Sequence, residues 1–200
     1  AAIDMRALDA VLSELAEIGY DAEWSSFYAS DVGAPHRRER WFCIAWPSGR
    51  PPTFANTNGV ESVGFVPELQ RFAARSDVQE VLQVEELLHN LDFTSEVVFD
   101  DNNRYTPSIR RWEKVTGFKV PVVTEPHPNK PGKQRLTAEF YEWMMGLPKG
   151  WVTSVPNVSY DYQMKIFGNG VVPQQAASAI QLLLARAHQE VTATANFATT

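Results

Sequence analysis

The chain has 200 residues, and 18 lysines and arginines against 24 aspartates and glutamates give it a net charge of −6. An apolar content of 44% excludes a disordered chain, and no apolar run is long enough to span a membrane. The single cysteine, Cys43, excludes an internal disulfide framework, and the four scattered histidines indicate no metal site. The first residues lack the basic and apolar regions of a signal peptide, so we expect a cytoplasmic protein.

Charge is unevenly distributed along the chain. Residues 1–35 carry −6 and residues 51–103 carry −8, whereas residues 36–50 carry +3 and residues 104–150 carry +5. An acidic chain of this kind is a poor general polyanion binder, but each basic segment can present a local surface for phosphate. The plainer alternative is that these charges only solvate exposed faces.

Apolar spacing predicts a helix and two strands before residue 47. Residues 4–18 repeat apolar side chains mostly every three or four positions, and Gly19 suits the left-handed position after a helix. The aromatic segment 24–28 predicts a strand, and the apolar segment 41–46 predicts a buried one. Residues 47–67 are rich in proline, glycine, asparagine and serine, which predicts a loop.

Helical spacing returns over residues 76–91. Further on, Thr106 as the N-cap and Pro107 as the first helical residue predict a helix that Gly117 ends. The proline-rich segment 121–134 predicts extended or loop structure.

Two more helices are predicted near the C-terminus. Thr137 caps a short one through Met145, and Pro173 starts a longer one to about Glu190. The tail from Val191 is expected to fray. The inner face of the longer helix is predicted to hold Ala176, Ile180, Leu183, Leu184 and Ala187.

The strongest chemical signal is DVGAPHRRERWFCIA, residues 31–45. A turn presents His36, Arg38 and Arg40 just before the predicted buried strand, and in an extended chain the two arginines share one face. Two converging guanidinium groups can hold a carbonyl oxygen and a phosphate through fixed donor forks. A basic strand edge that only solvates the end of a sheet is the alternative.

Two further segments carry weaker signals. In FGNGVVP, residues 167–173, two glycines allow close backbone approach just before a helix N-terminus, which favours a polar or anionic ligand. RLTAEFYEWMMGLPKGWVT, residues 135–153, is an aromatic, Met-rich helix followed by a turn. Taken singly, the first is equally typical of a plain turn and the second of core packing.

Together and in this order, the three segments resemble the DNA cytosine-C5 methyltransferases. The first resembles that family's Pro-Gln-x-Arg-x-Arg block, and the third resembles its Gly-Asn-x-Val-x-Pro turn. The second resembles its R-x-L-T block, although the start R-L-T is one residue shorter, and its wording is closest to phage and actinobacterial members. About 85 residues separate the first two segments, at the place of the family's target-recognition region.

The resemblance implies an α/β fold, the C-terminal part of a Rossmann-like, S-adenosylmethionine-dependent methyltransferase sheet with a small, irregular target-recognition region. Residues 1–46 would end the catalytic domain, residues 47–134 would be the target-recognition region, and residues 135–200 would close the catalytic domain. Members of the family bind S-adenosyl-L-methionine and flip a cytosine out of double-stranded DNA. A cysteine thiolate attacks C6 of the ring, which activates C5 for methylation.

The resemblance also assigns roles to residues. Arg40 would contact the O2 side of the base, and Arg38 would position the flipped nucleotide or the catalytic loop. The turn that lines the cofactor pocket would consist of Asn169, Gly170 and Val171. The helix over residues 107–116 is the best candidate for a groove or backbone contact, with a solvated helix face as its alternative. DNA contacts are expected at His36, which replaces the family's glutamine, and at Arg110, Arg111, Lys114 and Arg135.

The departures from the family bear on activity. The sequence has no D-x-F-x-G-x-G loop, no Pro-Cys-Gln and no Glu-Asn-Val, and Cys43 falls in the predicted buried strand, where a thiol is inert. We therefore expect a C-terminal portion that needs an N-terminal catalytic half, whether as a truncation or as one subunit of a split enzyme. A non-catalytic DNA-binding specificity subunit is the main alternative. A small helical interaction domain would not explain the three segments.

Overall fold

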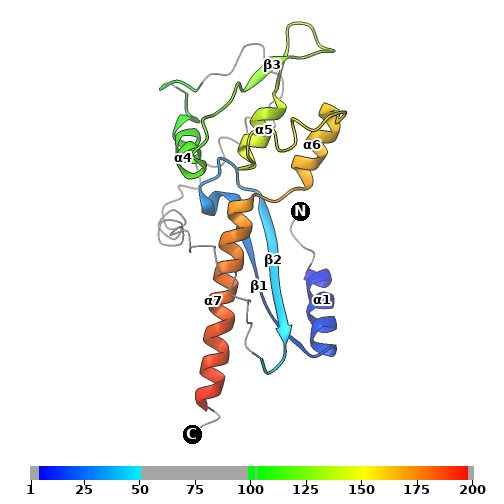
Figure 1. Cartoon of the computed structure of the whole chain (residues 1–200), viewed down its shortest axis with the longest axis vertical. Helices are drawn as coiled ribbons and strands as arrows, with labels where there is room; N and C mark the ends of the chain where they lie inside the picture. The colour runs from blue at the N-terminus through cyan, green and yellow to red at the C-terminus, as the bar shows by residue number, and fades with distance from the viewer. Residues whose placement is uncertain (1–4, 51–98, 102, 198–200) are drawn as a thin grey trace. The chain divides into compact units, whose positions relative to one another are not determined.

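The computed structural model describes residues 5–50, 99–101 and 103–197, except for the side chains of residues 5, 6 and 189–197. The described chain is a mixed α/β protein with two small sheets (Figure 1). It divides into two units, which are treated separately below. The helix predicted over residues 76–91 and most of the predicted loop over residues 47–67 lie outside the described residues.

The first unit contains residues 1–27, 39–68 and 176–200. Its first helix, α1, spans Met5–Glu17, and Gly19 follows with φ at +78°. The amide of Gly19 donates to the carbonyl of Ala16 at 3.0 Å. The predicted helix and the glycine that ends it are therefore both confirmed.

Strands β1 (Tyr20–Tyr28) and β2 (Glu39–Pro47) form a two-stranded sheet. Cross-strand aromatic pairs stabilise it, with Trp24 and Trp41 at 6.4 Å between ring centroids. The predicted burial of β2 is wrong, because Trp46 is its one buried residue and Cys43 is half-buried. An apolar strand is buried on both faces only when other layers of the protein cover both faces of its sheet. The described sheet has two strands, and most of β2 stays partly exposed.

Helix α7 spans Pro173–Phe197, so the start of the predicted helix is confirmed and the predicted fraying from residue 191 is wrong. The predicted inner face is partly wrong. Ile180 is 43% exposed, and Ala176 and Leu184 are half-buried. The buried stripe follows a spacing of four residues, which keeps its members on one helical face. That stripe consists of Ala179, Leu183 and Ala187.

The second unit contains residues 28–38 and 69–175. Its first element is the short 3₁₀ helix η1, Ala29–Val32. Helix α4 spans Thr106–Thr116, and Gly117 ends it with φ at +73°, as predicted. The predicted N-cap, Thr106, is instead the first helical residue, and Tyr105 is the N-cap. The Thr106 hydroxyl donates to the carbonyl of Asp100.

A hairpin and two helices complete the second unit. Strands β3 (Thr124–Pro126) and β4 (Gln134–Leu136) pair antiparallel within the segment predicted as extended or loop. Helix α5 (Ala138–Met144) begins after Thr137, whose hydroxyl accepts from the amide of Phe140 at 3.1 Å, which confirms the predicted cap. Helix α6 (Tyr160–Asn169) then leads into the turn before α7.

Candidate functional site

Arg38 holds the end of α6 and the turn that follows it. Its Nη2 atom donates to the carbonyl oxygens of Phe167, Gly168 and Gly170 at 2.9, 2.8 and 2.6 Å. A guanidinium group carries its donors in one rigid plane and stays charged, so its hydrogen bonds to carbonyls are directional and strong. One side chain of the first sequence segment therefore fixes the backbone of the third.

The backbone of Arg38 is itself constrained. Its φ is +31°, a value that residues with a Cβ adopt at a cost. Its carbonyl accepts from the Gln175 side chain at 2.9 Å and from the amide of Ala29 at 3.1 Å, which holds this conformation. The backbone is therefore not extended at Arg38. The prediction that Arg38 and Arg40 share one face assumed an extended backbone, which the structure does not have at Arg38. Arg40 lies in β2, in the other unit, where its Nη1 donates to the carbonyl of Glu39 at 2.9 Å.

His36 connects the first segment to the second. Its side chain is buried, 6% exposed, and Nε2 lies 3.0 Å from the carbonyl oxygen of Met144, at the end of α5. A carbonyl only accepts, so Nε2 carries the proton in this contact. The structure thus places His36 inside the protein, where it joins residues 108 positions apart in the chain.

A third contact joins the second segment to the start of α7, directly after the third segment. Gln174 Nε2 donates to the carbonyl of Gly146 at 3.2 Å. Gly146 has φ at +67°, and a Cβ there would lie less than 3 Å from both Gln174 Oε1 and Trp112 Cζ2. Only glycine fits this close approach. Residues 31–38 of the first segment therefore meet the second and third segments within one unit of the protein.

The turn over residues 169–172 presents one polar and one apolar side chain on a fixed backbone. Asn169 is exposed at the end of α6, and Val171 is 39% exposed, while Val172 is fully buried. The amide of Gly170 donates to the carbonyl of Ile166 at 2.8 Å, and a Cβ on Gly170 would lie 3.1 Å from that oxygen. Asn169 and Val171 are therefore held outward beside a glycine whose missing Cβ leaves room for the end of α6.

Tyr141 supports the turn from α5. Its ring stacks on Phe167, with 6.4 Å between centroids and 11° between planes. Burial raises the pKa of Tyr141 to about 12, and the nearby Tyr160 adds to the shift. The phenol is therefore neutral over the physiological range and acts as an aromatic packing group.

Glu142 is a structural residue that sequence reasoning missed. It is 1% exposed, and its carboxylate accepts from the amides of Gly150, Val152 and Thr153 at 2.7, 2.6 and 3.0 Å. The hydroxyl of Thr153 donates to it as well, at 3.0 Å. The carboxylate thus fixes the turn after α5, and the signal in the sequence was an acidic residue between aromatic ones, where an apolar residue is expected.

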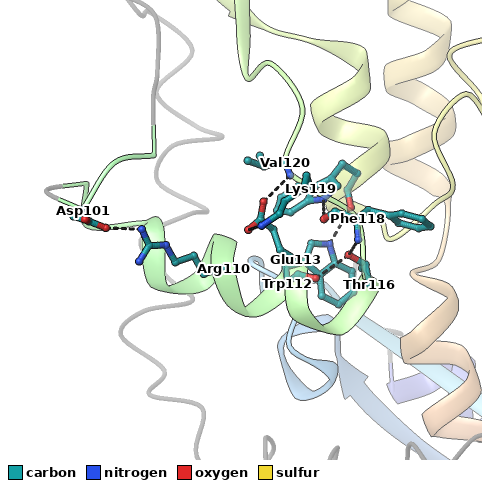
Figure 2. Close-up of polar contacts among 9 residues, drawn as sticks. Asp101, Arg110, Trp112, Glu113, Thr116, Phe118, Lys119 and Val120 are labelled. Atoms are coloured by element: carbon teal, nitrogen blue, oxygen red, sulfur yellow. Dashed lines mark hydrogen bonds and ion pairs between the residues drawn. The ribbon is translucent and has the colours of Figure 1, made fainter.

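The basic residues predicted on α4 differ in surroundings. Arg110 is exposed and forms an ion pair with Asp101, as Figure 2 shows. Arg111 is half-buried, and its Nε donates to the carbonyl of Gly33 at 3.4 Å. Lys114 is exposed. On this helix, one arginine is thus held by a surface carboxylate and the other by the backbone of another segment.

The end of α4 is fixed to the segment that follows it (Figure 2). Glu113 accepts from the amide of Val120 at 2.9 Å and pairs with Lys119 Nζ at 3.2 Å. A cavity of about 690 Å³ lies beside this segment, between residues 117–122, α5 and residues 147–149. The predicted site residues do not line it.

Arg135, the remaining predicted DNA contact, is engaged within the protein. It pairs with Glu125 at 2.7 Å across the β3–β4 hairpin, and its guanidinium lies 3.9 Å from the ring centroid of Tyr160. This arrangement joins β3, β4 and α6 through one cation.

Cys43 lies in β2 and is half-buried, which corrects its expected full burial. Burial raises the pKa of its thiol, and the carboxylate of Glu23 raises it further. Both effects favour the unreactive thiol. Within the residues described, no group of three histidine, cysteine, aspartate or glutamate side chains is placed to hold a metal ion. None of the described helices is long and apolar enough to span a membrane.

Comparison with known proteins gives a family match and a match to a curated protein. A family model for C-5 cytosine-specific DNA methylase matches residues 3–184. The chain is also 31% identical to Type II methyltransferase M.CviJI of Paramecium bursaria Chlorella virus IL3A, over 33% of this chain and 26% of the relative. The chain thus matches about a quarter of the length of that curated relative. No solved structure matches it.

Proposed function

Since the chain belongs to the C-5 cytosine-specific DNA methylase family, we propose that it is the C-terminal portion of a DNA cytosine-5 methyltransferase. In this proposal it transfers methyl groups to C5 of a flipped cytosine only together with an N-terminal half that supplies the nucleophile. Residues 1–46 and 135–200 belong to the catalytic domain, and residues 47–134 form the target-recognition region.

The assembly around Arg38 is the observation that carries the proposal. Its guanidinium holds the turn after α6, and His36, two residues earlier, binds the end of α5. Contacts over more than a hundred positions bring together the three segments that resemble the family's blocks. We assign Arg38 and His36 to positioning these segments, and Arg40 to contact with the flipped base.

S-adenosyl-L-methionine is the proposed cofactor, and it supplies the methyl group when bound. The turn after α6 suits a ligand with both polar and apolar parts, because Asn169 and Val171 are exposed beside Gly170. Its backbone is fixed before any ligand arrives, which lowers the entropic cost of binding. We therefore propose that Asn169, Gly170 and Val171 line the cofactor site.

Cys43 is a poor candidate for the nucleophile, which supports a second half. A catalytic cysteine needs a lowered pKa, whereas burial raises the pKa of Cys43. The Pro-Cys-Gln and Glu-Asn-Val blocks do not occur in the sequence. The first unit also exposes large apolar side chains, among them Ile18 at 67% and Trp24 at 40%. Such surface is typical of an interface.

Complementation tests the proposal. Methyl transfer from labelled S-adenosylmethionine to mixed-sequence duplex DNA is measured for this chain, for the N-terminal half of a family member that carries Pro-Cys-Gln, and for the two together. We expect activity only in the mixture, and a loss of more than about 100-fold with Arg40→Ala if that guanidinium stabilises charge on the reacting base. Activity of the chain by itself contradicts the proposal. DNA binding without methyl transfer in any sample favours a specificity subunit.

A further inference from the structure

Gln175 is a polar residue that is fully buried at the start of α7. It is the third residue of that helix and is 0% exposed. Burying an amide group costs free energy unless the group forms hydrogen bonds. The Nε2 atom of Gln175 donates to the carbonyl of Arg38 at 2.9 Å, across 137 positions of the chain. The side chain therefore joins the start of α7 to the backbone of the first segment.

The carbonyl of Arg38 accepts from the backbone amide of Ala29 as well as from Gln175. The Ala29 amide lies 3.1 Å from this carbonyl and also donates to the carbonyl of Arg37, at 2.8 Å, so its hydrogen bond is shared. The Gln175 donor lies closer, at 2.9 Å. Because Arg38 has φ at +31°, its conformation persists only where surrounding contacts hold it. Of these two donors, Gln175 therefore contributes more to holding Arg38 at this φ.

Arg38 binds the segment over residues 170–175 at both of its ends. Its guanidinium donates to the carbonyl of Gly170 at 2.6 Å, and its own carbonyl accepts from Gln175. Val171, between these two contacts, is 39% exposed. Without the contact from Gln175, the hold of Arg38 on this segment rests on the guanidinium alone.

The two contacts of Arg38 depend on each other. The rotamers open to a side chain depend on φ and ψ of its own backbone, and a guanidinium group carries its donors in a fixed plane. A change in φ at Arg38 therefore moves Nη2 relative to the carbonyl oxygens of Phe167, Gly168 and Gly170, which it now meets at 2.9, 2.8 and 2.6 Å. Gln175 thus acts on the turn after α6 through Arg38.

We propose that Gln175 is a positioning residue for cofactor binding. It fixes the backbone of Arg38, and Arg38 in turn orders the turn over residues 169–172. Gln175 is 0% exposed, so its effect passes through Arg38 and not through a contact with the ligand. A turn that is ordered in advance loses less conformational entropy when it binds. The inference rests on the proposed function, because that function makes this turn part of the S-adenosylmethionine site.

Amide hydrogen exchange tests the positioning role in the absence of any cofactor. Gln175→Met removes the donor and keeps a side chain of similar length and volume. The amide of Gly170 donates to the carbonyl of Ile166 at 2.8 Å, so its exchange, followed by NMR in the full chain, reports how firmly the turn is held. We expect this exchange to be about fivefold faster in Gln175→Met, the effect of one lost hydrogen bond.

Gln174→Met is the matched control, because it removes a neighbouring side-chain amide that donates to the carbonyl of Gly146 at 3.2 Å instead. It is expected to leave the exchange of the Gly170 amide at the rate of the parent chain. A thermal melt checks that each variant folds, and Gln175→Leu repeats the comparison if Gln175→Met does not fold.

The affinity for S-adenosylmethionine tests the link to the cofactor. Isothermal titration calorimetry is carried out on this chain together with the N-terminal half. We expect Kd to rise about fivefold in Gln175→Met, the effect of one lost hydrogen bond. We expect no further rise when Gln175→Met is added to Arg38→Ala, because residues that act through one network have non-additive effects.

Three results overturn the inference while the parent pair still binds the cofactor: unchanged exchange in Gln175→Met, unchanged affinity in Gln175→Met, or additive losses in the double variant. A faster exchange at Gly170 in the control Gln174→Met also overturns it. A parent pair that does not bind S-adenosylmethionine contradicts the proposed function itself, and the inference with it.

Discussion

At the scale of single residues, we expect removal of the Arg38 side chain to weaken cofactor binding more than it slows methyl transfer. Its guanidinium donates to the carbonyls of Phe167 and Gly168, at the end of α6, and to that of Gly170, in the turn that we propose to line the cofactor site. Its own backbone adopts φ of +31°, so the surrounding contacts hold it in a conformation that costs free energy. Such a combination is typical of a residue that positions others.

Arg38→Ala is expected to raise KM for S-adenosylmethionine in the complemented enzyme by about tenfold or more, with a smaller change in kcat. A hydrogen bond to a charged donor contributes about 1.5–3 kcal/mol. In the parent protein the hydrogen bonds from Arg38 order the turn before the cofactor binds. Arg38→Lys should restore part of the affinity. Arg37→Ala, next to it and exposed, is the control. An unchanged KM in Arg38→Ala, with a folded protein, rules out this positioning role.

Tyr141 gives a prediction on pH. Since burial raises its pKa from 10 to about 12, the unfolded chain ionises the phenol at a lower pH than the folded protein does. The free energy of unfolding should therefore decrease as pH rises from 10 to 12. Tyr141→Phe, which keeps the ring stacked on Phe167, should show a smaller decrease in urea unfolding over this range. Parallel curves for the two proteins would show that Tyr141 is not held neutral.

At the scale of elements, the turn after α5 depends on one carboxylate. Glu142→Gln replaces an acceptor oxygen with an amide group that cannot accept from the backbone amides of residues 150–153. The free energy of unfolding should fall by about 1–3 kcal/mol. Glu139→Gln, exposed on the same helix, should change it by less than about 0.5 kcal/mol. Equal effects of the two substitutions in urea unfolding would contradict the role assigned to Glu142.

The contact between the turn after α5 and the start of α7 depends on Gly146. In Gly146→Ala, the new Cβ meets Gln174 and Trp112 at less than 3 Å, in addition to the cost of φ at +67°. Gly117→Ala is the matched control, because it has φ at +73° but no atom within 4 Å of the added Cβ. We expect the control to cost about 1–2 kcal/mol and Gly146→Ala to cost about 1–3 kcal/mol more. Thermal or urea unfolding measures both, and equal costs would show that the close approach relaxes freely.

Local signals in the sequence predicted several elements correctly. Gly19 and Gly117 follow α1 and α4 in left-handed conformations, and the hydroxyl of Thr137 caps α5. These features depend on residues within four positions of each other, so the sequence shows them directly. The depth of burial of Cys43 and the buried face of α7 depend on what packs against each element, which apolar spacing does not specify.

At the scale of the whole molecule, sequence order indicated that the three segments belong together but not how they meet. His36 and Met144 are 108 positions apart, and Arg38 and Gly170 are 132 apart. No local pattern predicts such pairs. The sequence also suggested that Arg38 and Arg40 act from one face, whereas Arg38 is not extended and binds the backbone of the third segment. Tertiary contacts therefore redefine Arg38 as a positioning residue in our proposal.

The central claim is that this chain positions cofactor and base while its partner half supplies the nucleophile. The most direct test measures methyl transfer by the complemented pair with Cys43→Ser in this chain, and separately with serine in place of the partner's Pro-Cys-Gln cysteine. The account predicts that Cys43→Ser keeps nearly full activity and that the partner's substitution abolishes it. Loss of activity with Cys43→Ser in a folded chain, or methyl transfer that survives the partner's substitution, would contradict it.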